Sequence, residues 1–328
     1  MPASSACSES REGDGDLKSL VGNVSLTRRI FTHWELYLLL LPGLLYFLIF
    51  KYVPMFGIIM AFQEYSPFLG VTGSEWVGFR HFVDLFQYDQ FWRLLRNTLL
   101  ISFYNIVFYF PAPIVVALLL NELVRKWFKR TIQTIVYLPH FISWVVVGSI
   151  TYILLNTETG LVNQLIVSFG GEAHNFLADP DSFRTMIVLQ NIWKEVGWGT
   201  IIFLAALSGV DTQLYEAATV DGANRWHKLW HVTLPALRST ILILLILRLG
   251  NVLDVGFEQI FLMLNDLVYP VGDVFETFVY REGIGGVGLG GGRFSFGVAV
   301  GLFKSVVGLI LVLGANKLAK KFGEEGVF

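Results

Sequence analysis

Charged residues are scarce in this 328-residue chain. Asp, Glu, Lys and Arg make up 15% of it, whereas 54% of the residues are hydrophobic and the mean hydropathy is +0.59. A soluble domain carries about a quarter charged residues. The excess of apolar surface therefore predicts an integral membrane protein, and the net charge of -2 argues against a nucleic-acid partner.

Cysteine is almost absent as well. The single Cys7 excludes an internal disulfide framework, and no apolar run precedes it as in a lipoprotein signal. The sequence also lacks GxxxxGK[ST], the loop that cradles nucleotide phosphates, so we expect no nucleotide site in this chain. We assign no catalytic residue and no metal site. No cleavable signal peptide is visible, because the first apolar run is long and leads into more membrane sequence.

Long apolar stretches, by contrast, are abundant. A membrane span needs roughly 17–25 mainly apolar residues. Six candidates meet this length, the fourth and fifth with polar interruptions: 36–62, 99–120, 135–155, 185–210, 239–264 and 294–315. An all-α fold follows, because a helix satisfies its own backbone groups in lipid. We expect a mostly disordered cytoplasmic tail over 1–35, a six-helix domain over 36–316 and a cytoplasmic tail over 317–328.

Lysine and arginine set the orientation of the spans, because cytoplasmic segments carry an excess of them. With a cytoplasmic N-terminus, the inside segments hold fourteen of these residues: Arg11, Lys18, Arg28, Arg29, Arg125, Lys126, Lys129, Arg130, Arg225, Lys228, Arg238, Lys317, Lys320 and Lys321. The outside segments hold six: Arg80, Arg93, Arg96, Arg184, Arg281 and Arg293. Both termini are therefore predicted to be cytoplasmic.

One polar segment, LYEAATVDGANRWHKLWHVTLP over 214–235, lies in the predicted cytoplasmic loop between spans four and five. Asp211 is a good N-cap for a short helix over 212–220. Gly222 stands where a left-handed residue would turn the chain, and Asn224 can cap a second helix over 225–233. Pro235 suits the first turn of span five. Taken alone, the segment also fits an interfacial helix anchored by its tryptophans.

The order of residues in this loop resembles a known family signature. EAA, then Gly222, then the ending VTLP look like the EAA loop of binding-protein-dependent ABC importer permeases. The flanking segments NIWKEVGWGTIIFLAALSGVD, GFEQIFLMLN and FSFGVAVGLFKSVVGLILVLGANKLAKKFGEEG resemble carbohydrate-uptake permeases. Among these, the chain looks most similar to the group that imports complex oligosaccharides such as uronate-rich fragments, with permeases of alginate importers as an example.

The resemblance implies a multi-pass permease subunit of the bacterial cytoplasmic membrane. Its partners would be a second permease (usually a different chain), two ATP-binding subunits that hold ATP and Mg²⁺, and a solute-binding protein outside. The EAA loop, over 211–235, would be a coupling helix that fits a cleft on the ATPase. The residues that this assigns to coupling are Glu216, Ala217, Ala218, Asp221, Gly222, Leu234 and Pro235.

Polar residues inside spans are costly and mark functional sites. Two sets stand out, each on one helical arc at 100° per residue. Span four offers Gln190, Asn191, Lys194, Glu195 and Trp198 on one arc, and span five offers Arg248, Asn251, Asp254 and Glu258 on another. Trp193 and Phe257, in the same spans, add flat apolar faces. We interpret them as the lining of a substrate pathway, with the aromatic residues stacking on sugar rings. The alternative is structural ion pairing, of Lys194 with Glu195 and of Arg248 with Asp254 or Glu258.

Two other classes of membrane protein compete with an importer subunit. A secondary transporter would show an inverted repeat with matched broken helices, and the first half of the chain offers no pair to match spans four and five. A membrane-embedded transferase would need paired acidic groups near the interface. The one loose cluster is Glu172, Asp179 and Asp181, without acid–base spacing.

We read His140, which follows Pro139, as a packing residue in a kinked helix.

Overall fold

The computed structural model describes residues 34–284, 293–321, 323 and 326–327. The predicted N-terminal tail, apart from its last two residues, lies outside them. By contacts the chain divides into two units, residues 1–58 and 59–328. Within the described part of the first unit the chain is helical and its side chains are almost all exposed: α3 (Trp34–Phe47), η1 (Leu48–Tyr52) and α4 (Val53–Met55), with η2 (Phe56–Phe62) crossing the boundary between the units.

The described residues of the second unit form helices and one short antiparallel pair, β1 (Gln63–Glu64) with β2 (Glu75–Trp76). Its first helices are α5 (Gly70–Gly73), α6 (Arg80–Gln87), α7 (Phe91–Tyr104), η3 (Asn105–Tyr109), α8 (Pro111–Asn121), α9 (Lys126–Tyr137), η4 (Leu138–Phe141), α10 (Trp144–Leu155) and α11 (Leu161–Ser168). They are followed by α12 (Pro180–Ser208), α13 (Thr212–Val220), α14 (Arg225–Lys228), η5 (Leu229–Thr233), α15 (Leu234–Gly250), α16 (Phe257–Met263), α17 (Tyr269–Gly272), α18 (Phe275–Val279), η6 (Tyr280–Ile284) and α19 (Phe294–Lys321).

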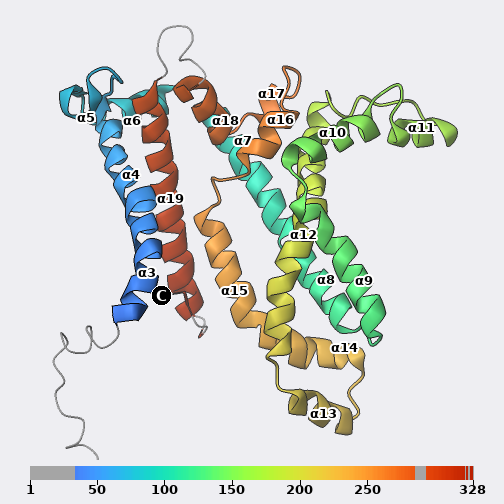
Figure 1. The fold of residues 1–328 in the computed structure, drawn as a ribbon. Coiled ribbons are helices and arrows are strands. Elements are labelled where there is room, and N and C mark those ends of the chain that lie inside the picture. Colours follow the sequence, from blue (N-terminus) through green and yellow to red (C-terminus); the bar gives the residue numbers. More distant parts are fainter. Residues whose placement is uncertain (1–33, 285–292, 322, 324–325, 328) are drawn as a thin grey trace, which may run out of the picture. The chain divides into compact units, whose positions relative to one another are not determined.

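Long α12 organises this second unit. It packs along α8, η3, α9, η4 and α15. Figure 1 shows α13 and α14 at one end of the unit and α10, α11, α16 and α17 at the other. The apolar core of this unit consists of separate clusters rather than one centre. One cluster joins Ala117 of α8, Phe203 and Leu207 of α12, and Leu237 of α15.

The prediction of an all-α membrane protein is confirmed, and four of the described helical stretches are long and apolar enough to cross a membrane: Trp34–Phe62, Phe91–Asn121, Arg225–Gly250 and Phe294–Lys321. A fifth exists if Lys126–Phe141 and Trp144–Leu155 form one span. The continuous helix α12 contains most of the predicted fourth span, but polar residues interrupt its apolar run. The count of six therefore stays a prediction. The last helix continues to Lys321, beyond the expected end at 315.

Two predicted spans differ from the structure in shape. The third is not straight, because the helices on either side of Ile142 are bent by 102°. Pro139 sits in the 3-10 turn at this bend, and Ser143 caps the helix that follows. The fifth is broken: α15 ends at Gly250, and α16 begins after Gly256, whose φ of 101° a residue with a side chain rarely adopts.

Candidate functional site

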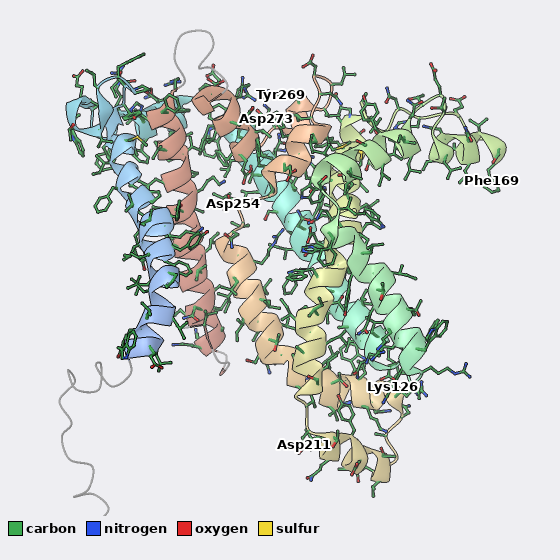
Figure 2. All side chains as sticks on the ribbon, in the orientation of Figure 1. Lys126, Phe169, Asp211, Asp254, Tyr269 and Asp273 are labelled. Carbon is green, nitrogen blue, oxygen red and sulfur yellow. The ribbon has the colours of Figure 1, made fainter. Side chains whose placement is uncertain are left out.

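The polar loop folds as a pair of helices at one end of the second unit. Asp211 caps α13 by accepting a hydrogen bond from Gln213 N (2.9 Å), as predicted (Figure 2). Gly222 turns the chain with a φ of 75°, and Ala223 N donates to Ala218 O (2.9 Å) to close the helix. Asn224 caps α14 through His227 N (2.9 Å). The capped helix over Thr212–Val220 and its turn are confirmed.

Side chains hold the two helices of the loop together. Lys228 Nζ donates to Thr219 Oγ1 (2.8 Å), and the Tyr215 hydroxyl lies 3.1 Å from Thr233 Oγ1. The second helix does not stop at 233 as expected. It continues through η5 into α15, with Pro235 in the first turn of that helix, so a movement of the loop would pass directly into α15.

The residues assigned to coupling lie mostly on the surface of this loop. Glu216, Ala217, Asp221, Gly222 and Pro235 are exposed, while Ala218 and Leu234 are partly buried. Glu216 has no hydrogen-bond or ion-pair partner within the described part of the chain. A carboxylate presented in this way on a capped helix suits recognition of a basic group on another protein.

The polar residues of α12 form a compact cluster at the bend between η4 and α10. Lys194 Nζ donates to Glu195 Oε1 and to His140 O, both at 2.9 Å, and lies 5.2 Å from the centre of the Trp144 ring. The other carboxylate oxygen of Glu195 is 2.7 Å from His140 Nδ1. The ring of Trp198 stacks on His140 at 4.6 Å. His140 therefore does more than pack in a kink: it links the bend to α12.

Other predicted pathway residues on α12 make structural contacts. Gln190 is buried; it donates to Thr151 Oγ1 (2.7 Å) and accepts from Gln259 (3.0 Å), which joins α12 to α10 and α16. Asn191 donates to Asn105 Oδ1 of η3 (2.8 Å). Trp193 and Trp198 are about half exposed and offer flat apolar faces.

The predicted stripe on span five does not form, because Gly250 and Gly256 break the helix that would carry it. Its members are distributed over α15 (Arg248), the connection (Asn251 and Asp254) and α16 (Phe257 and Glu258). Asn251, Asp254 and Glu258 are exposed, and Phe257 stacks against Phe261 at 5.2 Å.

The ion pair that forms in this region is not one expected from the sequence. Asp254 (Figure 2) binds Lys304 of α19, and the same Lys304 Nζ lies 2.9 Å from Glu276 Oε1 of α18. Glu276 also accepts from Val255 N (3.3 Å). The break between α15 and α16 is therefore held by a charged cluster that joins the connection itself to α18 and α19. Nothing in the sequence connects Lys304 or Glu276 to this position, since they come from other parts of the chain.

Arg248 and the α12 cluster meet through an aromatic residue that sequence reasoning missed. The guanidinium carbon of Arg248 lies 5.7 Å from the centre of the Tyr109 ring in η3. Tyr109 is half-buried and within electrostatic range of both Arg248 and Glu195. The structure thus brings Lys194, Trp198 and Arg248 around one polar region between α12, η3 and α15.

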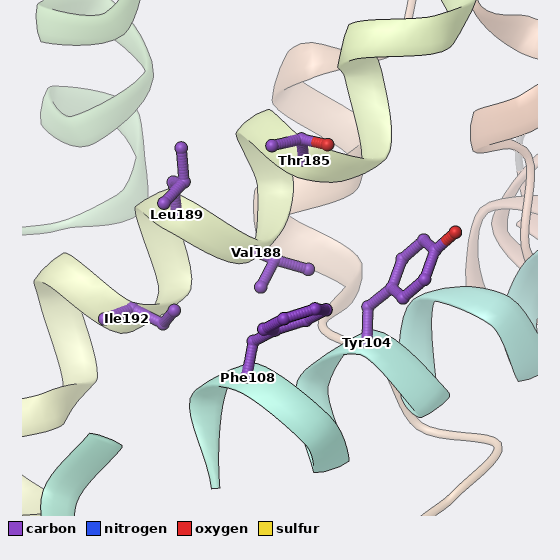
Figure 3. Close-up of a pocket in the computed structure, with 6 residues that line it drawn as sticks. All are labelled: Tyr104, Phe108, Thr185, Val188, Leu189 and Ile192. Carbon is purple, nitrogen blue, oxygen red and sulfur yellow. The ribbon is translucent and has the colours of Figure 1, made fainter. Parts of the chain in front are cut away.

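An apolar hollow of about 230 Å³ lies beside this region, against another face of α12 (Figure 3). Its lining consists of Tyr104, Phe108, Thr185, Val188, Leu189 and Ile192, and it includes none of the predicted pathway residues. With two hydroxyl groups and no charge, it offers few of the polar contacts that a sugar needs.

The acidic cluster considered for a transferase has a structural explanation. Asp179 caps α12, accepting hydrogen bonds from Asp181 N and Ser182 N (both 3.1 Å). The hydrogen bond from His174, with those from Ser182 and Asp181, lowers the pKa of Asp179 to about 2. A permanently ionised helix cap cannot serve as a general acid near neutral pH. Among the described residues, no group of three His, Cys, Asp or Glu residues is placed to hold a metal ion.

Curated relatives match the chain over most of its length. Protein LplB of Bacillus subtilis is 57% identical over 293 residues, covering 89% of this chain and 91% of that protein. The polygalacturonan/rhamnogalacturonan transport system permease protein YteP of the same organism is 54% identical, covering 89% and 90%. The arabinooligosaccharides transport system permease protein AraP of B. subtilis is 28% identical, covering 88% and 90%.

A solved structure and a family model agree with these relatives. A chain in the crystal structure of a bacterial alginate ABC transporter, in complex with an alginate pentasaccharide-bound periplasmic protein, superposes with a TM-score of 0.82 at 42% identity. The match covers 92% of this chain and 99% of that one. Residues 109–323, which include the polar loop and the predicted pathway residues, match the model of the binding-protein-dependent transport system inner membrane component. The chain therefore belongs to this family of ABC transporter permease subunits.

Proposed function

We propose that this chain is the permease subunit of an ATP-driven importer of oligosaccharides, in which it forms half of the translocation pathway. The observation that carries the proposal is the rigid, exposed helix pair α13–α14, which continues into α15 and so into the polar region around Arg248 and Lys194. A force applied to the loop would reach residues that contact a sugar. Relatives named for polygalacturonan/rhamnogalacturonan and arabinooligosaccharide transport support oligosaccharides as the substrate class.

The assembly that we propose has this chain paired with a second, different permease. Two ATPase subunits, which hold ATP and Mg²⁺, dock on the cytoplasmic loop, and a solute-binding protein delivers the sugar from outside. The alginate ABC transporter solved with its sugar-bound periplasmic protein supports the delivery of the sugar by a binding protein. Within the proposal, Glu216, Asp221 and Gly222 couple this chain to the ATPase. Trp198 and Trp193 stack on sugar rings, and Arg248 and Asn251 contact polar groups of the substrate.

Purification of the assembled transporter tests the proposal. We expect an affinity tag on this chain to co-purify a second permease and an ATPase. In proteoliposomes, ATP hydrolysis should rise several-fold on addition of the sugar-loaded binding protein, together with sugar uptake. A tagged chain that purifies without an ATPase, or that imports sugar at the same rate without ATP, would contradict the proposal and favour a secondary transporter.

The orientation in the membrane is open to a separate test. Asn224 precedes α14 and Lys320 lies in the last turn of α19, whereas Glu172 follows α11 at the opposite end of the second unit (Figure 1). In a Cys7→Ser background, Glu172→Cys should react with an impermeant thiol reagent in sealed cells, and Asn224→Cys and Lys320→Cys should react only after permeabilisation. Gly286, which the same orientation places outside, lies beyond the described residues. Labelling of position 224 in sealed cells would overturn the predicted topology.

A further inference from the structure

Three cations lie within the predicted spans of the second unit: Lys194, Arg248 and Lys304. Two of them have acidic partners. Lys194, with its side chain 7% exposed, is bound by Glu195 and by the His140 carbonyl. Lys304, 12% exposed, is bound by Asp254 and Glu276. Because carboxylates already neutralise both lysines, neither lysine can bind an anionic ligand unless its ion pair breaks. Separating a buried ion pair is costly.

Arg248 differs from both. Within the described residues no carboxylate lies at ion-pair distance from its half-buried guanidinium, and the aromatic face of Tyr109 is its described contact. An aromatic ring offers a cation only part of a negative charge. Its place in the last turn of α15 adds the partial negative charge of the helix end, about half an elementary charge. Both contacts hold the guanidinium in place and leave its full charge without an anionic partner.

The surroundings of Arg248 favour a ligand that is both acidic and sugar-like. The chain leaves the helix immediately after it, and exposed Asn251 offers an amide one turn further on. On the other side, Tyr109 connects it to the α12 cluster, where the half-exposed Trp198 presents a flat face. A planar guanidinium binds a carboxylate through two parallel hydrogen bonds, a geometry that a lysine cannot reproduce.

We infer that Arg248 binds a carboxylate of the transported sugar, and that the substrates are therefore anionic oligosaccharides built from uronic acids. This rests on the proposed function. Lys194, which the sequence offered equally, is assigned to the bend at η4 instead, because Glu195 and His140 already bind it. The competing explanation is an acidic residue of the partner permease that pairs with Arg248 in the assembled transporter.

Uptake of charged and neutral versions of the same sugars tests the inference. The assembled transporter in proteoliposomes is given short oligogalacturonates and alginate oligomers, each as the acid and in carboxyl-reduced form. We expect Arg248→Gln to lower uptake of the acidic oligomers about tenfold or more, the size of one lost charge-assisted hydrogen bond, with little effect on the reduced ones. Arg248→Lys should fall between, and the exposed control Lys126→Gln should match the wild type.

Chemical rescue separates charge from shape. In a Cys7→Ser background, Arg248→Cys modified with an aminoethyl thiosulfonate should regain uptake of acidic oligomers, whereas a sulfonatoethyl thiosulfonate should not restore it. Equal results with both reagents would overturn the inference. Loss of the partner permease from purified Arg248→Gln would also overturn it, because that loss would indicate that Arg248 forms an ion pair with the partner permease. If the wild-type transporter takes up the neutral oligomers but not the acidic ones, the inference is overturned and the proposed function remains intact. Uptake of neither form overturns the inference, whereas the proposed function is judged by co-purification of the ATPase and its stimulation by the binding protein.

Discussion

Glu216→Ala in the assembled transporter should weaken docking of the ATPase and abolish most of the stimulation of ATP hydrolysis by the sugar-loaded binding protein. Glu216 is exposed on α13 and has no described partner in this chain, so its partner in the proposed assembly is a basic group on the ATPase. Truncating one member of a desolvated charged pair costs about 2–5 kcal/mol. Co-purification of the ATPase and stimulated hydrolysis in proteoliposomes measure the effect, and sugar uptake should fall with them.

Gly222 offers a second, independent way to disturb the same loop. No heavy atom lies within 4 Å of a Cβ placed there, so a larger residue meets open space, but the φ of 75° is strained for any branched side chain. Gly222→Val should therefore misdirect α13 and mimic Glu216→Ala. The matched control is Gly222→Asn, since asparagine tolerates this conformation and should keep most of the coupling.

Both variants leave the helices of the membrane domain unchanged, so the second permease should still co-purify. Normal stimulation and normal uptake in both Glu216→Ala and Gly222→Val would show that the loop is a membrane-surface anchor. A Gly222→Asn variant as defective as Gly222→Val would show that the space around the turn, rather than its backbone conformation, is what the partner requires.

Gly308→Val should prevent stable folding of the permease. Helix α19 crosses α15 at this position so closely that a Cβ on Gly308 would overlap the carbonyl oxygen of Gly250. Small residues allow such backbone approach between membrane helices. A backbone carbonyl cannot rotate away as a side chain can, so the cost should exceed the ~1–3 kcal/mol of ordinary overpacking. The measurement is the yield of monodisperse protein after detergent extraction and its thermal unfolding midpoint.

Gly301 provides the matched control for Gly308, because it lies in the same helix and a Cβ there would meet nothing within 4 Å. Gly301→Val should express and melt close to the wild type. If both variants are equally unstable, valine is harmful anywhere in α19 and the close contact with α15 is not the cause. If Gly308→Val is as stable as the control, the α15–α19 crossing described here is wrong.

Local structure followed from the sequence where its causes are local. Asp211, Gly222 and Asn224 were expected to cap and turn the loop, and they do so because each acts on backbone groups within about four residues. The all-helical membrane fold followed for a related reason. In lipid there is no water to bind the backbone N–H and C=O groups of an apolar segment, so they hydrogen-bond to one another within a helix. The interrupted spans were also visible as polar residues within apolar runs.

Which charges pair was decided by the tertiary structure alone. The adjacent Lys194 and Glu195 were open to prediction, but their third partner, His140, lies 55 residues from Glu195. Asp254 was expected beside Arg248 and instead binds Lys304, because α15 ends at Gly250 and the chain leaves the helical arc that would have placed the two side chains together. The sequence by itself thus determined the all-helical fold and the caps and turn of the polar loop. The choice of Arg248 as the cation left open to a ligand depended on which helix faces meet, and periodicity within a single helix does not contain that information.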